Sequence, residues 1–279
     1  EITTRLVGSE MCIRDRDMTN GTIMDKLITF SLPLMLSGIL QLMFNAVDII
    51  VVGRFTGSSA LAAVGSTTAL INVFTNLFIG ISLGANVLAA RFYAAGREKE
   101  MSETVHTAIA LALVSGLIMA VVGVVFAKGA LILMDTPADV IGQSALYMRI
   151  YFVGMPFFML YNYGAAILRA VGDTKRPLIF LIVSGVINAL LNLFLVIVCD
   201  MGVAGVAWAT FLCQSISCIL SLVVVLRRLH KIETDEKHYI FSKSIFVQFI
   251  IIAIPSILQQ SFISVSYTHL RAHETRSNL

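Results

Sequence analysis

The chain has 279 residues, of which 57% are hydrophobic and only 13% are charged, and its mean hydropathy is +0.87. Because soluble domains carry about 25% charged residues, this composition excludes an ordinary soluble globular protein and indicates an integral membrane protein. The net charge of +3 is too small to indicate a nucleic-acid partner.

The two ends of the sequence differ from everything between them. Residues 1–16 and 266–279 show neither helical periodicity nor a signal-peptide pattern, and both resemble translated sequencing-adapter read-through. We therefore expect a foreign tail at each end, with a native portion that begins near Asp17 and breaks off near Val265.

The first predicted membrane span, Leu27–Val52, contains a carboxylate, Asp48. An ionised Asp deep in a bilayer costs roughly 2.5–3.5 kcal/mol, so such a residue usually faces a cavity and has a function. Steps of four, four and three residues place four polar side chains on one helix face: Ser37, Gln41, Asn45 and Asp48. The alternative is that Asp48 lies near the outer end of the helix and contacts headgroup water.

Six further stretches reach the length of about 20 residues that a bilayer requires: Leu61–Ala89, Thr104–Ala127, Gly142–Leu168, Pro177–Cys199, Val203–Leu226 and Ile245–Val265. The loops after the second, fourth and sixth spans carry eleven basic residues, whereas the loops after the first, third and fifth carry only Arg54 and Lys128. By the positive-inside rule, the basic loops and the native N-terminus are predicted to be cytoplasmic. Asp48 then lies in the outer half of the first span.

Polar side chains recur at helical spacing on several of the other spans. The most polar faces are formed by Asn72, Asn76 and Asn86, by Ser184, Asn188 and Asn192, and by Thr210, Gln214, Ser217 and Ser221. Individual Ser and Thr residues are better explained as hydrogen-bonding groups between packed helices. For Asn188 and Asn192, a functional site together with the intramembrane Asp is the better explanation.

Two prolines lie inside predicted spans and allow the helices to bend. Pro33 in the first span and Pro156 in the fourth each remove a backbone hydrogen bond. Aromatic and polar side chains surround Pro156 at helical steps: Tyr147, Tyr151, Phe158 and Asn162. Core packing and contact with a ligand both remain open for these aromatic residues.

The seventh span resembles the first. Aligning Pro33 with Pro255, 222 residues apart, also pairs Ile28 with Ile250 and Leu36 with Leu258. Six spans separate the two prolines, and an even number means that both halves enter the membrane in the same direction, as in transporters with parallel repeats. The offset predicts an intact protein of about 450 residues, of which this chain holds one half and one helix.

Three motifs carry a resemblance to a known family: FNAVDIIVVGR, ILRAVGDTKRP and GVAGVAWAT. With them, residues 17–265 resemble the multidrug and toxic compound extrusion (MATE) family, in its prokaryotic DinF-like and MepA-like branch. The resemblance implies an all-α integral membrane protein with two six-helix lobes around a central cavity. It also implies export of cationic amphipathic compounds in exchange for H⁺ or Na⁺.

The resemblance and the repeat together divide the chain into four segments. We expect a foreign tail at 1–16, an N-terminal six-helix lobe at 17–230, a linker with the first helix of a C-terminal lobe at 231–265, and a foreign tail at 266–279.

The resemblance further implies a cation-coupling network in the first lobe. Asp48 matches its acid and Pro33 matches the proline at which the first helix bends, while the other polar positions are Tyr147, Asn162, Asn188 and Thr210. Two positions depart from the family pattern, because Phe44 replaces a tyrosine and Asn192 replaces a second acid. A single carboxylate has no second acid with which to share a proton, so Na⁺ at Asp48, or a coupling site in the missing lobe, stays open beside H⁺. The substrate cavity is assigned to Gln41, Phe44, Asn45 and Phe158.

Two other functions compete with drug export as explanations of this sequence. A lipid-linked saccharide or lipid flippase of the same superfamily should line its cavity with basic residues, and only Arg149 lies well inside a span. An intramembrane aspartyl protease needs two facing carboxylates, and Asp200, the other acid near membrane depth, falls in a loop.

The sequence therefore predicts a transporter and not an enzyme, in agreement with the absence of HExxH, GxSxG and Walker motifs. We expect no cofactor and no firmly bound metal, with cationic or amphipathic small molecules and the lipid bilayer as partners. When complete, the protein is expected to be a monomer that crosses a bacterial inner membrane several times.

Overall fold

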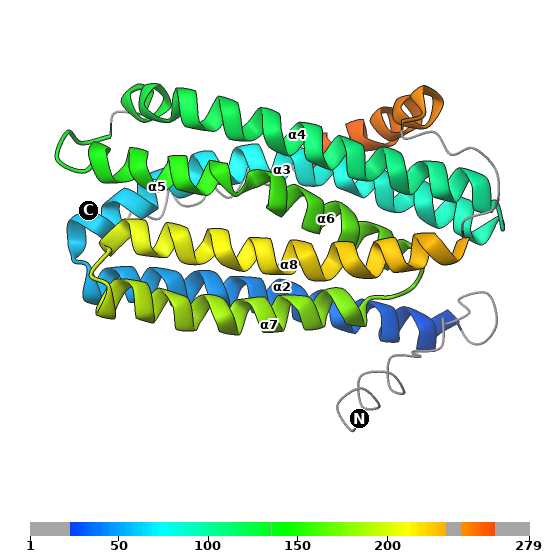
Figure 1. Ribbon diagram of the computed structural model, residues 1–279, viewed down its shortest axis with the longest axis horizontal. Coiled ribbons are helices and arrows are strands. Elements are labelled where there is room, and N and C mark those ends of the chain that lie inside the picture. Colours follow the sequence, from blue (N-terminus) through cyan, green and yellow to red (C-terminus); the bar gives the residue numbers. More distant parts are fainter. Residues whose placement is uncertain (1–22, 135, 233–240, 260–279) are drawn as a thin grey trace.

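The computed structural model describes residues 23–134, 136–232 and 241–259, which form helices joined by short connections (Figure 1). In chain order the elements are α2 (Ile23–Phe55), α3 (Ser58–Ala94), α4 (Glu98–Leu133), α5 (Ile141–Val153), α6 (Met155–Ala170), α7 (Lys175–Leu193), the π-helical turn η1 (Phe194–Val198) and α8 (Gly202–Ile232). A further helix, Lys243–Gln259, is called the C-terminal helix below. The tails expected at 1–16 and 266–279, and the end of the seventh span after residue 259, lie outside the described residues.

The helices confirm the predicted fold class of an all-α integral membrane protein. Among the described residues, five helical segments are long and apolar enough to cross a membrane, and α5 with α6 forms a sixth, bent span. Each of the six coincides with a span predicted from the sequence. The C-terminal helix is apolar but, as far as it is described, shorter than a full span.

The spans lie side by side as an elongated bundle whose connections gather at its two ends (Figure 1). The centre of the bundle is α6, which packs against α3, α4 and α8 and buries Met159, Tyr163 and Leu168 completely. At one edge, α2 packs mainly against α7. Apolar side chains of α2, such as Leu42 at 71% exposure, remain uncovered by the described residues.

The fourth span bends at the predicted proline. The axes of α5 and α6 differ by 47° at the break beside Pro156. Across the break, the Gly154 N–H donates to the Tyr151 carbonyl at 3.0 Å. Gly116 of α4 packs directly on the bend, because a β-carbon at this position would lie 2.5 Å from the Cα of Pro156. The bend thus depends on a proline in one helix and on the missing side chain of a glycine in its neighbour.

By contrast, α2 runs through Pro33 as one uninterrupted helix. The hydroxyl of Ser37, which lies one turn after Pro33, donates to the Pro33 carbonyl oxygen at 2.7 Å. The bending role that the resemblance implies for Pro33 stays a prediction.

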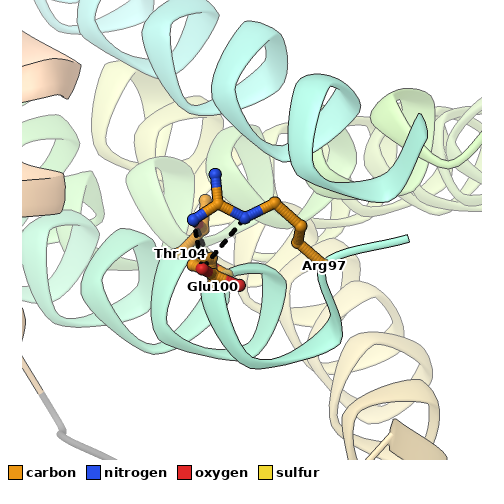
Figure 2. Close-up of polar contacts among 3 residues, drawn as sticks. All are labelled: Arg97, Glu100 and Thr104. Carbon is orange, nitrogen blue, oxygen red and sulfur yellow. Dashed lines mark hydrogen bonds and ion pairs between the residues drawn. The ribbon is translucent and has the colours of Figure 1, made fainter. Parts of the chain in front are cut away.

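Side-chain contacts fix the start of α4. Arg97 folds back over the first turn, where its Nε donates to Glu100 Oε1 at 2.9 Å (Figure 2). The Thr104 hydroxyl donates to the Glu100 carbonyl at 2.6 Å. Since an acidic side chain in the first turn also interacts favourably with the helix dipole, α4 begins before the apolar stretch that the sequence analysis identified.

A buried carboxylate holds the turn between α6 and α7. Asp173, at 8% exposure, accepts a hydrogen bond from the Arg176 backbone N–H at 3.2 Å. Its other carboxylate oxygen accepts one from Arg228 Nη2 of α8 at 2.9 Å. Asp173 therefore caps the first turn of α7 and joins it to the end of α8.

A tight contact between α4 and α5 includes Gly123, and we expect its replacement to destabilise the full-length protein. At Gly123, a β-carbon would lie 2.0–2.5 Å from ring atoms of Phe152, which is fully buried and packs edge-on against Phe74 at a centroid distance of 6.0 Å. Phe152 cannot move aside, so Gly123→Ala should lower the stability by about 1–3 kcal/mol through overpacking. The melting temperature of the detergent-purified protein measures this loss.

Gly129 on the same helix provides the matched control, because a β-carbon there meets no atom within 4 Å. Gly129→Ala should be neutral or should stabilise the helix by up to about 1 kcal/mol. Equal melting temperatures for the two variants would contradict the packing described for Gly123.

Candidate ion-coupling site

The candidate site forms where α2 and α7 meet. Asp48 of α2 is partly buried, and its Oδ1 accepts a hydrogen bond from Nδ2 of Asn192, a fully buried residue of α7. The close approach of the two helices has a local cause, since a β-carbon at Gly185 of α7 would lie 2.0 Å from the Phe44 ring. Phe44 thus packs on the bare backbone of α7, one helical turn from Asp48.

A second amide extends the pair along α7. Asn192 Nδ2 also donates to Oδ1 of Asn188, one turn earlier, at 3.1 Å. The Oδ1 of Asn192 is buried, and the described residues place no donor within hydrogen-bonding distance of it. Buried polar atoms rarely lack hydrogen-bond partners, so this oxygen is unusual. The site therefore offers one carboxylate and one neutral oxygen that can accept a further hydrogen bond or bind a cation.

Two further helices, α5 and α8, carry a tyrosine pair and a buried thiol. The pair is Tyr147 and Tyr151 of α5, and the thiol is that of Cys213 of α8. The two tyrosine rings stack with their centroids 6.2 Å apart. The Cys213 thiol donates to the Ser184 carbonyl of α7 at 2.6 Å.

Neither the stack of Tyr151 on Tyr147 nor the bond of Cys213 to α7 was predicted from the sequence. Tyr151 lies one turn after Tyr147, so its helical spacing was a usable signal. Cys213 had none, because a single cysteine in an apolar helix usually behaves as a small buried hydrophobe.

Two predicted network residues bond within their own helices. Asn162 Nδ2 donates to the Phe158 carbonyl at 2.8 Å, and the Thr210 hydroxyl donates to the Val206 carbonyl at 3.0 Å. Neither side chain forms a hydrogen bond with Asp48 in the part of the chain that the structure describes, and their part in ion coupling stays a prediction.

The residues assigned to the substrate cavity lie in different surroundings. Gln41 and Asn45 are exposed on α2, on the part of this helix that the described residues leave uncovered. Phe158 packs against the core, and Phe44 packs on Gly185. Their assignment to a cavity also remains a prediction.

The donor set differs from that of a transition-metal centre. Within the described ranges, His, Cys, Asp and Glu side chains nowhere gather in groups of three or more. The side chain that bonds to Asp48 is instead the Asn192 amide, which also bonds to Asn188. Carboxylate and amide oxygens are hard ligands, unlike the thiolates of soft transition-metal sites.

This chain resembles known proteins in sequence over most of its length. A family model described as MatE matches residues 33–194. The chain is 35% identical over 245 residues to the probable multidrug resistance protein YoeA of Bacillus subtilis. This alignment covers 85% of this chain and 53% of YoeA. The chain is also 23% identical over 249 residues to the multidrug export protein MepA of Staphylococcus haemolyticus. That alignment covers 88% of this chain and 54% of MepA. The chain thus spans about half the length of the curated relatives it matches.

Solved structures have the same fold. A crystal structure of MATE in the bent conformation aligns with a TM-score of 0.80 at 21% identity, over 90% of this chain and 56% of that chain. The outward-facing conformation of a multidrug resistance MATE family transporter of the MOP superfamily aligns with a TM-score of 0.78 at 22% identity, over 88% of this chain and 55% of that chain.

Proposed function

Because the chain belongs to the MatE family, whose members are transporters and not enzymes, we propose that it is the N-terminal part of a secondary active antiporter that exports drugs. In this proposal residues 17–230 form one lobe, and the C-terminal helix is the first helix of a second lobe. The proposal is supported by relatives described as multidrug resistance and multidrug export proteins. The repeat of the Pro33 segment around Pro255 supports the second lobe.

The hydrogen bond between Asn192 and Asp48 is the observation that carries the coupling mechanism. It joins an acid of α2 to α7, so a cation that binds Asp48 changes the contact between these two helices. In alternating access, cation binding from outside would loosen this contact and favour release of the drug outward. Loss of the cation to the cytoplasm would restore the contact.

Na⁺ is proposed as the coupling ion of this lobe, with H⁺ as the competing outcome. A proton site gains from two acids that share one proton, and here the second position is an amide. An amide oxygen can bind a metal ion but is not protonated near neutral pH. Asn192 Oδ1, which is buried and accepts no hydrogen bond among the described residues, takes this role in the proposal after the amide turns over, because the amide now directs Nδ2 at Asp48.

The proposed substrates are cationic amphipathic molecules, and the proposed location is a bacterial cytoplasmic membrane with the basic loops inside. A substrate cation can bind the carboxylate itself or aromatic faces such as those of Tyr147 and Phe158. Members of this family need no cofactor.

Drug efflux by the full-length protein, measured in vesicles against imposed Na⁺ and H⁺ gradients, tests the proposed function. Efflux that follows the Na⁺ gradient is expected. Efflux that follows the H⁺ gradient and is abolished only by substitutions in the second lobe would show that this lobe does not couple the ion. Absence of efflux under either gradient would refute drug antiport.

The variant Asn192→Asp should convert the site from sodium towards proton coupling. Two carboxylates within hydrogen-bonding distance repel each other when both are ionised and tend to share a proton. Efflux by the variant should therefore depend more steeply on external pH than wild-type efflux, and it should fall as the external pH rises because the shared proton is lost.

The measurement is the initial efflux rate across a range of external pH, with and without Na⁺, for the wild type and for Asn192→Asp. Identical pH profiles for the two proteins would mean that Asn192 is not part of the ion site.

A further inference from the structure

One apolar contact sets how closely α2 and α7 approach beside the candidate ion site. A β-carbon at Gly185 of α7 would lie 2.0 Å from Cε2, 2.1 Å from Cζ and 2.5 Å from Cδ2 of the Phe44 ring. Carbon atoms in ordinary contact are about 3.5–4.0 Å apart, so the ring leaves no room for any side chain at this buried glycine. The Phe44 ring therefore rests on the backbone of α7.

This contact and the bond between Asp48 and Asn192 belong to the same interface. Phe44 and Asp48 are four residues apart on α2, which places them on one face of that helix. On α7, Gly185, Asn188 and Asn192 follow at steps of three and four residues and likewise share a face. The apolar contact and the polar pair thus join the same two helix faces, and the first limits the spacing at the second.

A bond to α8 fixes α7 at the level of Gly185. The carbonyl oxygen of Ser184, the preceding residue, accepts a hydrogen bond from the Cys213 thiol of α8 at 2.6 Å. Both of these residues are buried. A group added at residue 185 must therefore displace the Phe44 ring or α2, and either movement changes the space beside Asp48.

The space between the carboxylate and the amides determines which cation fits there. Asp48 supplies the negative charge, and the buried Oδ1 of Asn192 is the neutral oxygen assigned to the cation above. Alkali cations carry the same charge and differ in radius, so a site distinguishes them by its size and by the field strength of its ligands. Helices held at a fixed spacing give the site one size.

We propose that the contact between Phe44 and Gly185 makes the site at Asp48 and Asn192 selective for Na⁺ over the larger K⁺. Phe44 and Gly185 do not bind the ion, and they act as positioning residues that fix the distance between its ligands. The inference rests on the proposed function, because it needs a sodium site in this lobe. It adds the discrimination between the two cations and the residues responsible for it.

Binding of radioactive sodium to the purified full-length protein, with unlabelled Na⁺ or K⁺ as competitor, tests this inference. Gly185→Ala should weaken Na⁺ binding about tenfold, the change produced by a loss of about 1.4 kcal/mol in binding free energy. Binding of K⁺ should change less, so the ratio of the K⁺ to the Na⁺ dissociation constant should fall. Phe44→Leu, which removes ring atoms and leaves the space on Gly185 unfilled, should lower the same ratio.

The double variant Gly185→Ala/Phe44→Leu should restore the ratio towards the wild-type value. Leucine lacks Cε2 and Cζ, the two ring atoms closest to a β-carbon at residue 185, so the added methyl group finds room. The matched control is Gly38→Ala on α2, where a β-carbon meets no atom within 4 Å, and this variant should bind both ions as the wild type does. A purely structural role would reduce the amount of protein that binds and leave the ratio of the two constants unchanged.

An unchanged ratio in either folded single variant would overturn the proposal, as would a double variant that is no closer to the wild type than Gly185→Ala. If Gly185→Ala does not fold, as judged by gel filtration, the ratio measured for Phe44→Leu decides alone. Absence of sodium binding to the wild type would refute the proposed sodium site and the inference with it. Sodium binding to the wild type with unchanged ratios in the variants would refute the inference only.

Discussion

Replacement of Asp48 by Asn in the full-length protein should reduce ion-driven drug efflux to the level of protein-free vesicles. The substitution keeps the size of the side chain and an oxygen that can accept the hydrogen bond from Asn192, but it removes the negative charge that the proposed cation needs. Because a partly buried charge is lost without a change in volume, the variant should be as stable as the wild type. Efflux in reconstituted vesicles and the melting temperature measure the two effects.

Asp139→Asn is the matched control for this experiment. Asp139 is an exposed carboxylate in the short connection before α5 and belongs to neither α2 nor α7. Its replacement should leave efflux unchanged. Wild-type efflux by Asp48→Asn under an imposed ion gradient would refute the role of Asp48, and a lower melting temperature would indicate a structural role instead.

The second prediction with a large expected effect concerns the 279-residue chain expressed by itself. The 279 residues alone should export no drug, because α2 leaves Leu42, Met35 and Ile50 at 71%, 65% and 62% exposure on the face where the proposed second lobe would complete the cavity. The measurement is ethidium efflux from cells that express only this chain, with its amount in the membrane fraction determined in parallel.

The full-length protein expressed at the same level is the control, and it should restore efflux. Efflux by the 279-residue chain above that of cells with an empty vector would contradict the two-lobe cavity. If the chain is absent from the membrane fraction, efflux must be compared between cells that hold equal amounts of the two proteins in the membrane.

Much of the fold could be predicted because its determinants are local. The apolar length of each stretch predicted six spans that the helices now confirm, and Pro156 predicted the bend between α5 and α6. The length of an apolar run and the missing N–H of a proline act within one segment, whatever the neighbouring helices do.

The pairing within the candidate site depends on how the helices are rotated, and this was harder to predict. Asp48 and Asn192 were both named from the sequence, and the structure joins them by a hydrogen bond. Asn162 and Thr210 bear equally polar side chains but bond to carbonyls of their own helices. Amides and hydroxyls can bond to either their own or a neighbouring helix, and spacing along one helix does not decide between the two.

The tight contacts between helices could not be predicted at all. Phe44 packs on Gly185, and Ile257 packs on Gly80. Both contacts depend on how each helix is rotated toward its neighbour. The π-helical turn η1, which begins two residues after Asn192, was likewise hidden in an apolar run. Such turns are frequently found at functional sites, and this one ends the helix that carries both site asparagines.

The most direct test of the central claim, that Asp48 and Asn192 form the coupling-ion site, is drug-driven uptake of radioactive sodium into vesicles that contain the full-length protein. An imposed drug gradient should drive Na⁺ movement in the opposite direction in the wild type, and Asp48→Asn should abolish this movement. Drug-driven proton movement without Na⁺ movement in the wild type, unchanged in Asp48→Asn, would contradict the account.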